Sequence, residues 1–108
     1  MLFAIHALDF TGVLPVRLAD YDAHKAFLSD TVRFGVKIVI SGPLVSDDGE
    51  KMIGSLFLVE APDRDEVEAF NRADPFTEAG IWGTRFDYGI CTAPRLKSPR
   101  SCRSYCNC

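Results

Sequence analysis

The sequence has 108 residues, 47% hydrophobic and 25% charged, which suits one domain with a packed core and argues against general disorder. Residues 92–108 carry four basic and no acidic side chains, so the formal net charge of −3 leaves −7 on residues 1–91. An acidic body repels phosphate backbones, so we expect no nucleic-acid partner. No apolar run reaches the roughly 18 residues of a membrane span, and the N-terminus lacks signal-peptide features. We therefore expect a cytoplasmic protein with no membrane partner and with reduced thiols.

Residues 1–8 form a short apolar run that only His6 interrupts, which is typical of a central strand. A break at residues 9–12 leads into the main amphipathic helix, in which Pro15 suits the first turn and Gly35 suits a left-handed cap after the last. Positions that recur every three or four residues predict the buried stripe of this helix: Ala23, Phe27, Thr31 and Phe34. A second stripe should lie where the buried face meets solvent: Arg17, Tyr21, His24 and Leu28.

A second strand is predicted at residues 36–40, which are rich in β-branched side chains. The tripeptide Ser41-Gly42-Pro43 should end or bend it. Asp48-Gly49 then favours a tight hairpin turn, because both residue types tolerate the positive φ angles that such a turn needs. The return strand is predicted at residues 52–60.

Asp63 and Glu66 have capping-box spacing and predict the start of a second helix. That helix should bury Val67, Phe70 and Ala73 and should end before Pro75, because a residue that precedes proline avoids helical geometry. Residues 76–81 should be irregular or form a single helical turn, and the alternation at residues 84–90 predicts the last strand.

This order of elements predicts an α+β fold of the ferredoxin-like βαββαβ type, with both helices on one face of a four-stranded antiparallel sheet. The predicted central strands are apolar on both faces, although two helices can cover only one. We therefore expect a homodimer in which a second sheet covers the open face.

The topology should gather several polar residues at one edge of the sheet: His24, Asp74, His6 and the segment Ser41-Gly42-Pro43. A carboxylate beside an imidazole fixes its tautomer and makes it a general base near neutral pH. Each residue also has a plainer interpretation: a solvated or core-edge histidine at His24, a helix-ending Asp-Pro at Asp74, a packed strand residue at His6, and a backbone contact at Ser41.

Several segments in this order resemble the YciI-like (YCII-related) family: Met1–Asp9, Arg17 with Ala23–Leu28, Ser41–Leu44, Asp47–Gly49, Gly54–Leu56, Asp74–Phe76 and Ala79-Gly80. The resemblance covers residues 1–91. It implies a subunit of a dimeric α+β barrel with a His–Asp dyad, here His24 and Asp74, and one such relative is a dehydrochlorinase for a chlorinated hydroxyhydroquinone. Relatives often have Arg-Pro where this chain has Tyr21-Asp22, which bears on the substrate class.

Residues 92–108 match nothing in that family, and we expect a flexible basic extension there. Cys102, Cys106 and Cys108 form CxxxC and CxC spacings that could gather a soft metal, but no histidine is near and the zinc pattern is incomplete. We expect no metal site and no cofactor.

These observations favour a small enzyme that performs cofactor-free acid–base chemistry on a small polar cyclic or aromatic molecule. His24 would be the acid or base and Asp74 its orienting partner. The candidate ligand contacts are Ser41, Gly42, Pro43, His6 and Arg17. Two alternatives remain: a non-catalytic module that binds a small molecule in the same cleft, and a structural dimerisation domain with a vestigial cleft.

Overall fold

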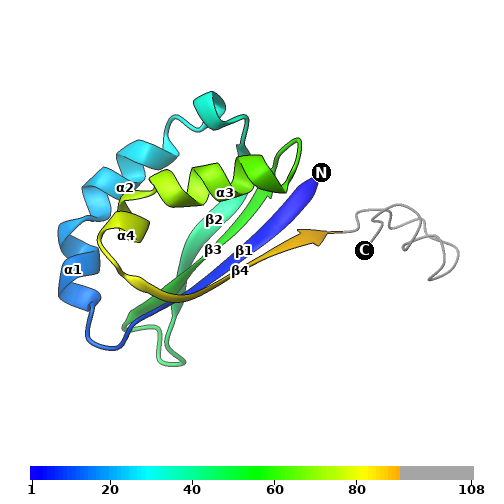
Figure 1. Ribbon diagram of the computed structural model, residues 1–108. Helices are drawn as coiled ribbons and strands as arrows, with labels where there is room; N and C mark the ends of the chain where they lie inside the picture. Colours follow the sequence, from blue (N-terminus) through cyan, green and yellow to red (C-terminus); the bar gives the residue numbers. More distant parts are fainter. Residues whose placement is uncertain (91–108) are drawn as a thin grey trace, which may run out of the picture.

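The computed structural model describes residues 1–90, which form one antiparallel sheet with helices on a single face (Figure 1). The sheet has four strands in the order β2-β3-β1-β4. The elements in chain order are β1 (Leu2–Asp9), α1 (Leu14–Ala19), α2 (Tyr21–Leu28), the 3-10 turn η1 (Val32–Phe34), β2 (Lys37–Val45), β3 (Met52–Glu60), α3 (Arg64–Ala73), α4 (Pro75–Glu78) and β4 (Trp82–Ile90). The predicted α+β class with a four-stranded antiparallel sheet is confirmed.

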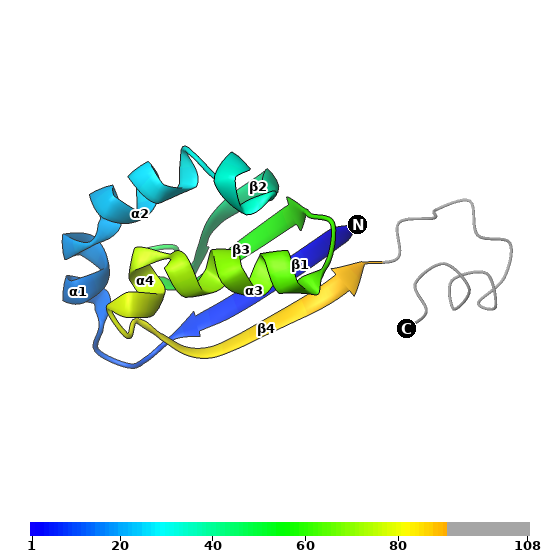
Figure 2. The ribbon, with the colours of Figure 1, turned by 45° about the horizontal axis from the view of Figure 1, so that its top comes forward.

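The core lies between the sheet and the helices, and both views show the helices over the same side of the strands (Figures 1 and 2). Alternate residues of β1 and β3 point to this side, as the two-residue period of a strand requires. They meet the apolar side of α3, which Asp63 caps by accepting a hydrogen bond from the Glu66 N–H at 3.0 Å. The most buried members of this core are Phe3, Ile5, Phe57, Val59, Val67 and Phe70.

The predicted long first helix is wrong, because the chain forms α1, α2 and η1 instead of one continuous helix. Asp20 separates α1 from α2 at φ −96° and ψ 4°, outside helical geometry. Gly35 does adopt the predicted left-handed conformation, at φ 68°. On α2 Ala23, expected in the core, is exposed, whereas Arg17 and His24, expected where the buried face meets solvent, are buried.

β2 runs through Ser41-Gly42-Pro43 instead of ending there. The pairing of β2 with β3 shifts register between Ile38 and Ile40, so a bulge supplies the bend that the tripeptide was expected to make. Proline is tolerated because β2 is an edge strand of the described sheet. Likewise Pro75 follows the end of α3 as expected but then begins α4.

The face of the sheet away from the helices is apolar and open in the chain described here. Four large side chains on it are between 41% and 63% exposed: Ile40, Leu56, Phe86 and Tyr88. His6 pairs with Leu56 on one side and Phe86 on the other, so it lies on this open face. Among residues 1–90, no helix is both long enough and apolar enough to cross a membrane.

Candidate functional site

The side chains of His24 and Asp74 meet between α2 and the junction of α3 with α4. His24 lies on α2 with 6% of its surface exposed, and its Nδ1 is 2.8 Å from Oδ1 of Asp74, which is 1% exposed. Asp74 joins α3 to α4 with an extended backbone, as expected for a residue that precedes proline. Its Oδ1 also accepts a hydrogen bond from the Phe76 N–H at 2.9 Å. Asp74 therefore caps α4 and faces the imidazole with the same oxygen.

This contact decides which nitrogen of His24 is available for chemistry. An ionised carboxylate can only accept hydrogen bonds, so Nδ1 of His24 donates and Nε2 of the neutral ring keeps its lone pair. The second oxygen of Asp74, Oδ2, is buried and has no hydrogen-bond partner within residues 1–90.

Aromatic rings hold the imidazole in place. Phe76 stacks on His24 with ring centroids 3.9 Å apart and planes 6° from parallel. Phe57 of β3 approaches the same ring edge-on, with centroids 6.0 Å apart. Both phenylalanines are buried, so the histidine ring has little freedom to turn.

Arg17 is a second charged group in this region, and only 2% of its surface is exposed. Its Nη1 donates to both carboxylate oxygens of Asp9 at 2.9 and 3.1 Å, and its Nη2 donates to Ser55 Oγ at 2.8 Å. Its Cζ lies 4.8 Å from the centroid of the Phe76 ring. Burial raises the pKa of the Asp9 carboxyl, and the Arg17 guanidinium partly opposes that rise.

A cavity of about 300 Å³ opens between α1, α2 and the strands β2 and β3. Its lining carries the cations Arg17 and Lys25, the hydroxyls of Ser41 and Ser55, and no carboxylate. Such a lining offers hydrogen-bond donors to an anionic or oxygen-rich ligand. The full lining is Arg17, Tyr21, His24, Lys25, Leu28, Ser41, Gly42, Pro43, Ser55 and Phe57.

Five of the seven candidate site residues named from the sequence share this cavity: Arg17, His24, Ser41, Gly42 and Pro43. Asp74 lies behind His24, to which it is hydrogen-bonded. His6 does not belong to the group. Ile5 and Ala7 point to the helices and are buried, so strand alternation sends His6 to the open face.

Sequence reasoning missed Asp9, Ser55 and Phe76. The signal for Asp9 was present, because it keeps the two-residue period of Ile5 and Ala7 and so should face the helices. Ser55 pairs with Ala7 and follows the same rule. Phe76 gave no such signal, because a segment expected to be irregular or a single turn has no period that would assign its side chains to a face.

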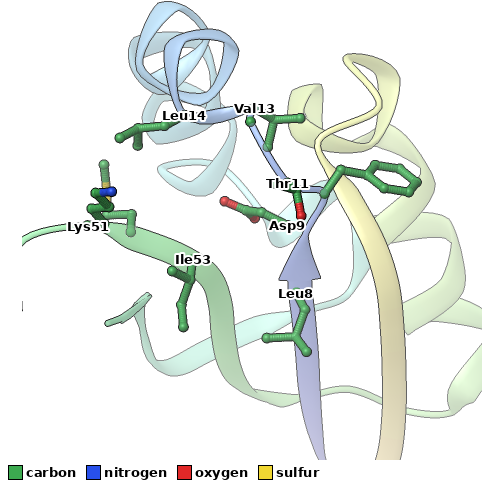
Figure 3. Close-up of a pocket in the computed structure, with 10 residues that line it drawn as sticks. Leu8, Asp9, Thr11, Val13, Leu14, Lys51 and Ile53 are labelled. Carbon is green, nitrogen blue, oxygen red and sulfur yellow. The ribbon is translucent and has the colours of Figure 1, made fainter. Parts of the chain in front are cut away.

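A second cavity of about 500 Å³ borders Asp9 on the other side (Figure 3). Figure 3 shows the Asp9 carboxylate pointing into the space between Leu14 and Ile53. The remaining lining is Leu8, Phe10, Thr11, Gly12, Val13, Lys51 and Met52. Asp9 thus borders one cavity, and its partner Arg17 borders the other.

A polar cluster lies apart from both cavities, between α3 and the edge strand β4. Asn71 Nδ2 donates to both carboxylate oxygens of Asp87 at 3.2 Å, and Arg85 Nη2 lies 3.2 Å from Glu68 Oε2. Burial and a hydrogen bond with Glu68 raise the pKa of Asp87 to about 6, against the charges of Arg85 and Arg64. In residues 1–90 no three His, Cys, Asp or Glu side chains are grouped to hold a metal ion. The cysteine spacings considered above lie outside these residues.

Comparison with known proteins agrees with this architecture. A family model described as the YCII-related domain matches residues 1–86. The structure is similar to that of 5-chloro-2-hydroxyhydroquinone dehydrochlorinase (TftG) from Burkholderia phenoliruptrix in complex with 2,5-dihydroxybenzoquinone, with a TM-score of 0.74 and 36% identity over 83% of this chain and 93% of that one. A NIPSNAP domain protein from Burkholderia xenovorans is more distant, at 16% identity and a TM-score of 0.49 over 91% of this chain and 100% of that one. No curated protein sequence matches the chain.

Proposed function

Because the chain belongs to the YCII-related domain family, we propose that it is a cofactor-free enzyme in which His24 and Asp74 perform acid–base chemistry on a small oxygenated ring. The observation that carries this proposal is the 2.8 Å hydrogen bond between the two side chains, made at the wall of a cavity of about 300 Å³. The hydrophobic core cluster is formed by other, aromatic and aliphatic, side chains.

In this proposal Nε2 of His24 takes a proton from the ligand or returns one to it. Asp74 holds the ring in the tautomer that leaves Nε2 free, and its charge stabilises the imidazolium once the proton has moved. The Phe76 and Phe57 rings keep the imidazole at a fixed angle to the cavity. A general base held in this way typically contributes about 10²- to 10⁴-fold to a rate.

The lining supports a planar, oxygen-rich substrate. Arg17, Lys25 and Ser41 can donate to ring oxygens, while Phe57 and Tyr21 offer aromatic surface. The dehydrochlorinase relative is complexed with 2,5-dihydroxybenzoquinone, a molecule of this description. We propose the same reaction type here: one hydroxyl proton moves to the ring carbon that carries chlorine, His24 takes the proton of a second hydroxyl, and chloride leaves with the electrons of the carbon–chlorine bond as the ring becomes a quinone. Two O–H bonds and one C–Cl bond break, one C–H bond forms, and the net loss is HCl. This step needs no oxidant or reductant.

We further propose that the working form is a homodimer, built as a dimeric α+β barrel. The support is the open face of the sheet, where Leu56, Phe86 and Tyr88 are large, apolar and exposed. A second copy would bury them against an equivalent face, and a specific interface of this kind buries more than about 1,000 Å².

The test is chloride release from 5-chloro-2-hydroxyhydroquinone by the full chain. We expect turnover by the wild type and by Asp22→Asn, a control that removes an exposed charge from α2 outside the cavity. His24→Gln should lose at least about 10²-fold. Binding of 2,5-dihydroxybenzoquinone without turnover of the chlorinated compound would instead favour the non-catalytic binding module. The proposal would be refuted if the full chain neither bound 2,5-dihydroxybenzoquinone nor released chloride from the chlorinated compound.

A further inference from the structure

We propose that Asp9 and Ser55 are positioning residues, which hold the guanidinium of Arg17 where it stabilises negative charge on an oxygen of the ligand at the His24 cavity. This inference rests on the proposed function and deepens it. It assigns a role to two residues that belong to β1 and β3 and that make no contact with the histidine in the described structure.

A guanidinium that is 2% exposed must be compensated, since an unpaired buried charge is costly. Asp9 compensates it with two contacts to Nη1, at 2.9 and 3.1 Å. Ser55 Oγ accepts a hydrogen bond from Nη2 at 2.8 Å, and the Ser55 side chain is itself buried. A planar fork held at both ends has one orientation, which a lysine in the same place would not have.

The same guanidinium is tied to the histidine through Phe76. The Phe76 ring lies 4.8 Å from Cζ of Arg17 and stacks on the His24 ring at 3.9 Å. Arg17, Ser55 and His24 all line the cavity of about 300 Å³. The cation and the base are therefore fixed relative to one ring and face one space.

This arrangement suits a proton transfer. When His24 removes a proton, negative charge forms on a ligand oxygen, and a cation already in place stabilises it without rearrangement. Ser55 Oγ accepts from Arg17, so the hydroxyl hydrogen remains free to donate to the same ligand. Asp9 balances the charge of Arg17 when the cavity is empty, and its pKa depends on that partner in return.

The position of Asp9 allows a substitution that changes charge without changing shape. Its carboxylate borders the cavity of about 500 Å³, so the isosteric change Asp9→Asn introduces no steric clash (Figure 3). It does remove the charge that compensates Arg17, so the folded state of the variant is checked by urea unfolding before its kinetics are compared. Asp22→Asn removes the same charge from an exposed site outside both cavities and is the matched control.

The first measurement is kcat and KM for chloride release. Because the contact acts on charge that forms in the transition state, Asp9→Asn should lower kcat by about 10- to 100-fold with little change in KM. Ser55→Ala should lower kcat by about 10-fold, and Asp22→Asn should behave as the wild type. Wild-type kcat in Asp9→Asn, or a loss confined to KM, would overturn the inference.

The second measurement does not depend on turnover. In ¹⁵N NMR spectra the guanidinium of Arg17 should give slowly exchanging, well-resolved N–H signals in the wild type and in Asp22→Asn. The signals should broaden or vanish in Asp9→Asn and Ser55→Ala. If the wild type releases no chloride, the proposed function fails, and this spectrum still decides whether the two residues position Arg17. Identical Arg17 signals in all four proteins would overturn the positioning role.

Discussion

Replacing Asp87 by asparagine should remove a pH-dependent weakness from the contact between α3 and β4. The folded protein raises the pKa of Asp87 to about 6 from an ordinary value of 3.8, so it binds this proton more tightly than the unfolded chain does. The contribution of the protonated Asp87 carboxyl to the free energy of unfolding is therefore complete below about pH 4 and is lost as the pH rises through about 6. At neutral pH the ionised Asp87 carboxylate lowers the free energy of unfolding, and a neutral asparagine at this position would not.

The size of this effect follows from the shift. A difference of about two pKa units corresponds to at most about 3 kcal/mol. The neighbouring arginines and the nearby solvent screen the carboxylate, so we expect about 1–2 kcal/mol. The side-chain oxygen of the introduced asparagine can still accept a hydrogen bond from the Asn71 amide, which donates to Asp87 in the wild type.

The assay is urea unfolding of wild type, Asp87→Asn and the exposed hairpin control Asp47→Asn, at about pH 5 and about pH 7.5 and at one protein concentration. The stability of Asp87→Asn relative to wild type should rise by about 0.5–1 kcal/mol between the two pH values, because roughly half of the full change already lies below pH 5. The control should show no comparable change. A constant difference between Asp87→Asn and wild type would refute the reasoning.

Three further outcomes are expected. Phe76→Ala should destabilise the fold by about 3–5 kcal/mol in the same assay, because the ring is buried and contacts both His24 and Arg17. The milder Phe76→Leu should destabilise it less. Equal stability of Phe76→Ala and wild type would contradict this packing. Leu56→Lys should turn the proposed dimer into a monomer in sedimentation experiments, whereas Val32→Lys, exposed on η1 away from the sheet, should not. In ¹⁵N NMR at alkaline pH, the neutral His24 ring should carry its proton on Nδ1 in the wild type and in Asp63→Ala, which removes another helix cap, but should shift toward Nε2 in Asp74→Ala.

The order of strands and helices could be predicted because each boundary carries a local signal. Gly35, Asp63 and Pro75 act through their own backbone preferences, and strand alternation needs only a few neighbouring residues. The break at Asp20 could not be predicted in this way. The apolar spacing on either side of it continues in helical register, and only tertiary packing decides that Arg17 and His24 turn inward.

The meeting of His24 and Asp74 could be anticipated from topology, because right-handed crossovers fix which element ends share an edge. The same reasoning misplaced His6, since reaching the correct edge does not decide which face of the sheet a side chain occupies. The pairing of Arg17 with Asp9 and Ser55 was harder to foresee. It depends on the rotation of α1, which no sequence pattern specifies.

Pro43 belongs both to the wall of the cavity and to an edge of the described sheet. It lines the space beside His24 and also sits in the outermost strand on the β2 side of the sheet. A proline nitrogen carries no hydrogen, so at Pro43 the edge strand β2 lacks a backbone N–H donor that an added strand from another molecule could use. Growth of the sheet into ribbons or fibrils is thereby discouraged beside the proposed ligand cavity. Engineering of Pro43 for altered ligand preference would therefore also change the tendency to aggregate, and both should be measured together.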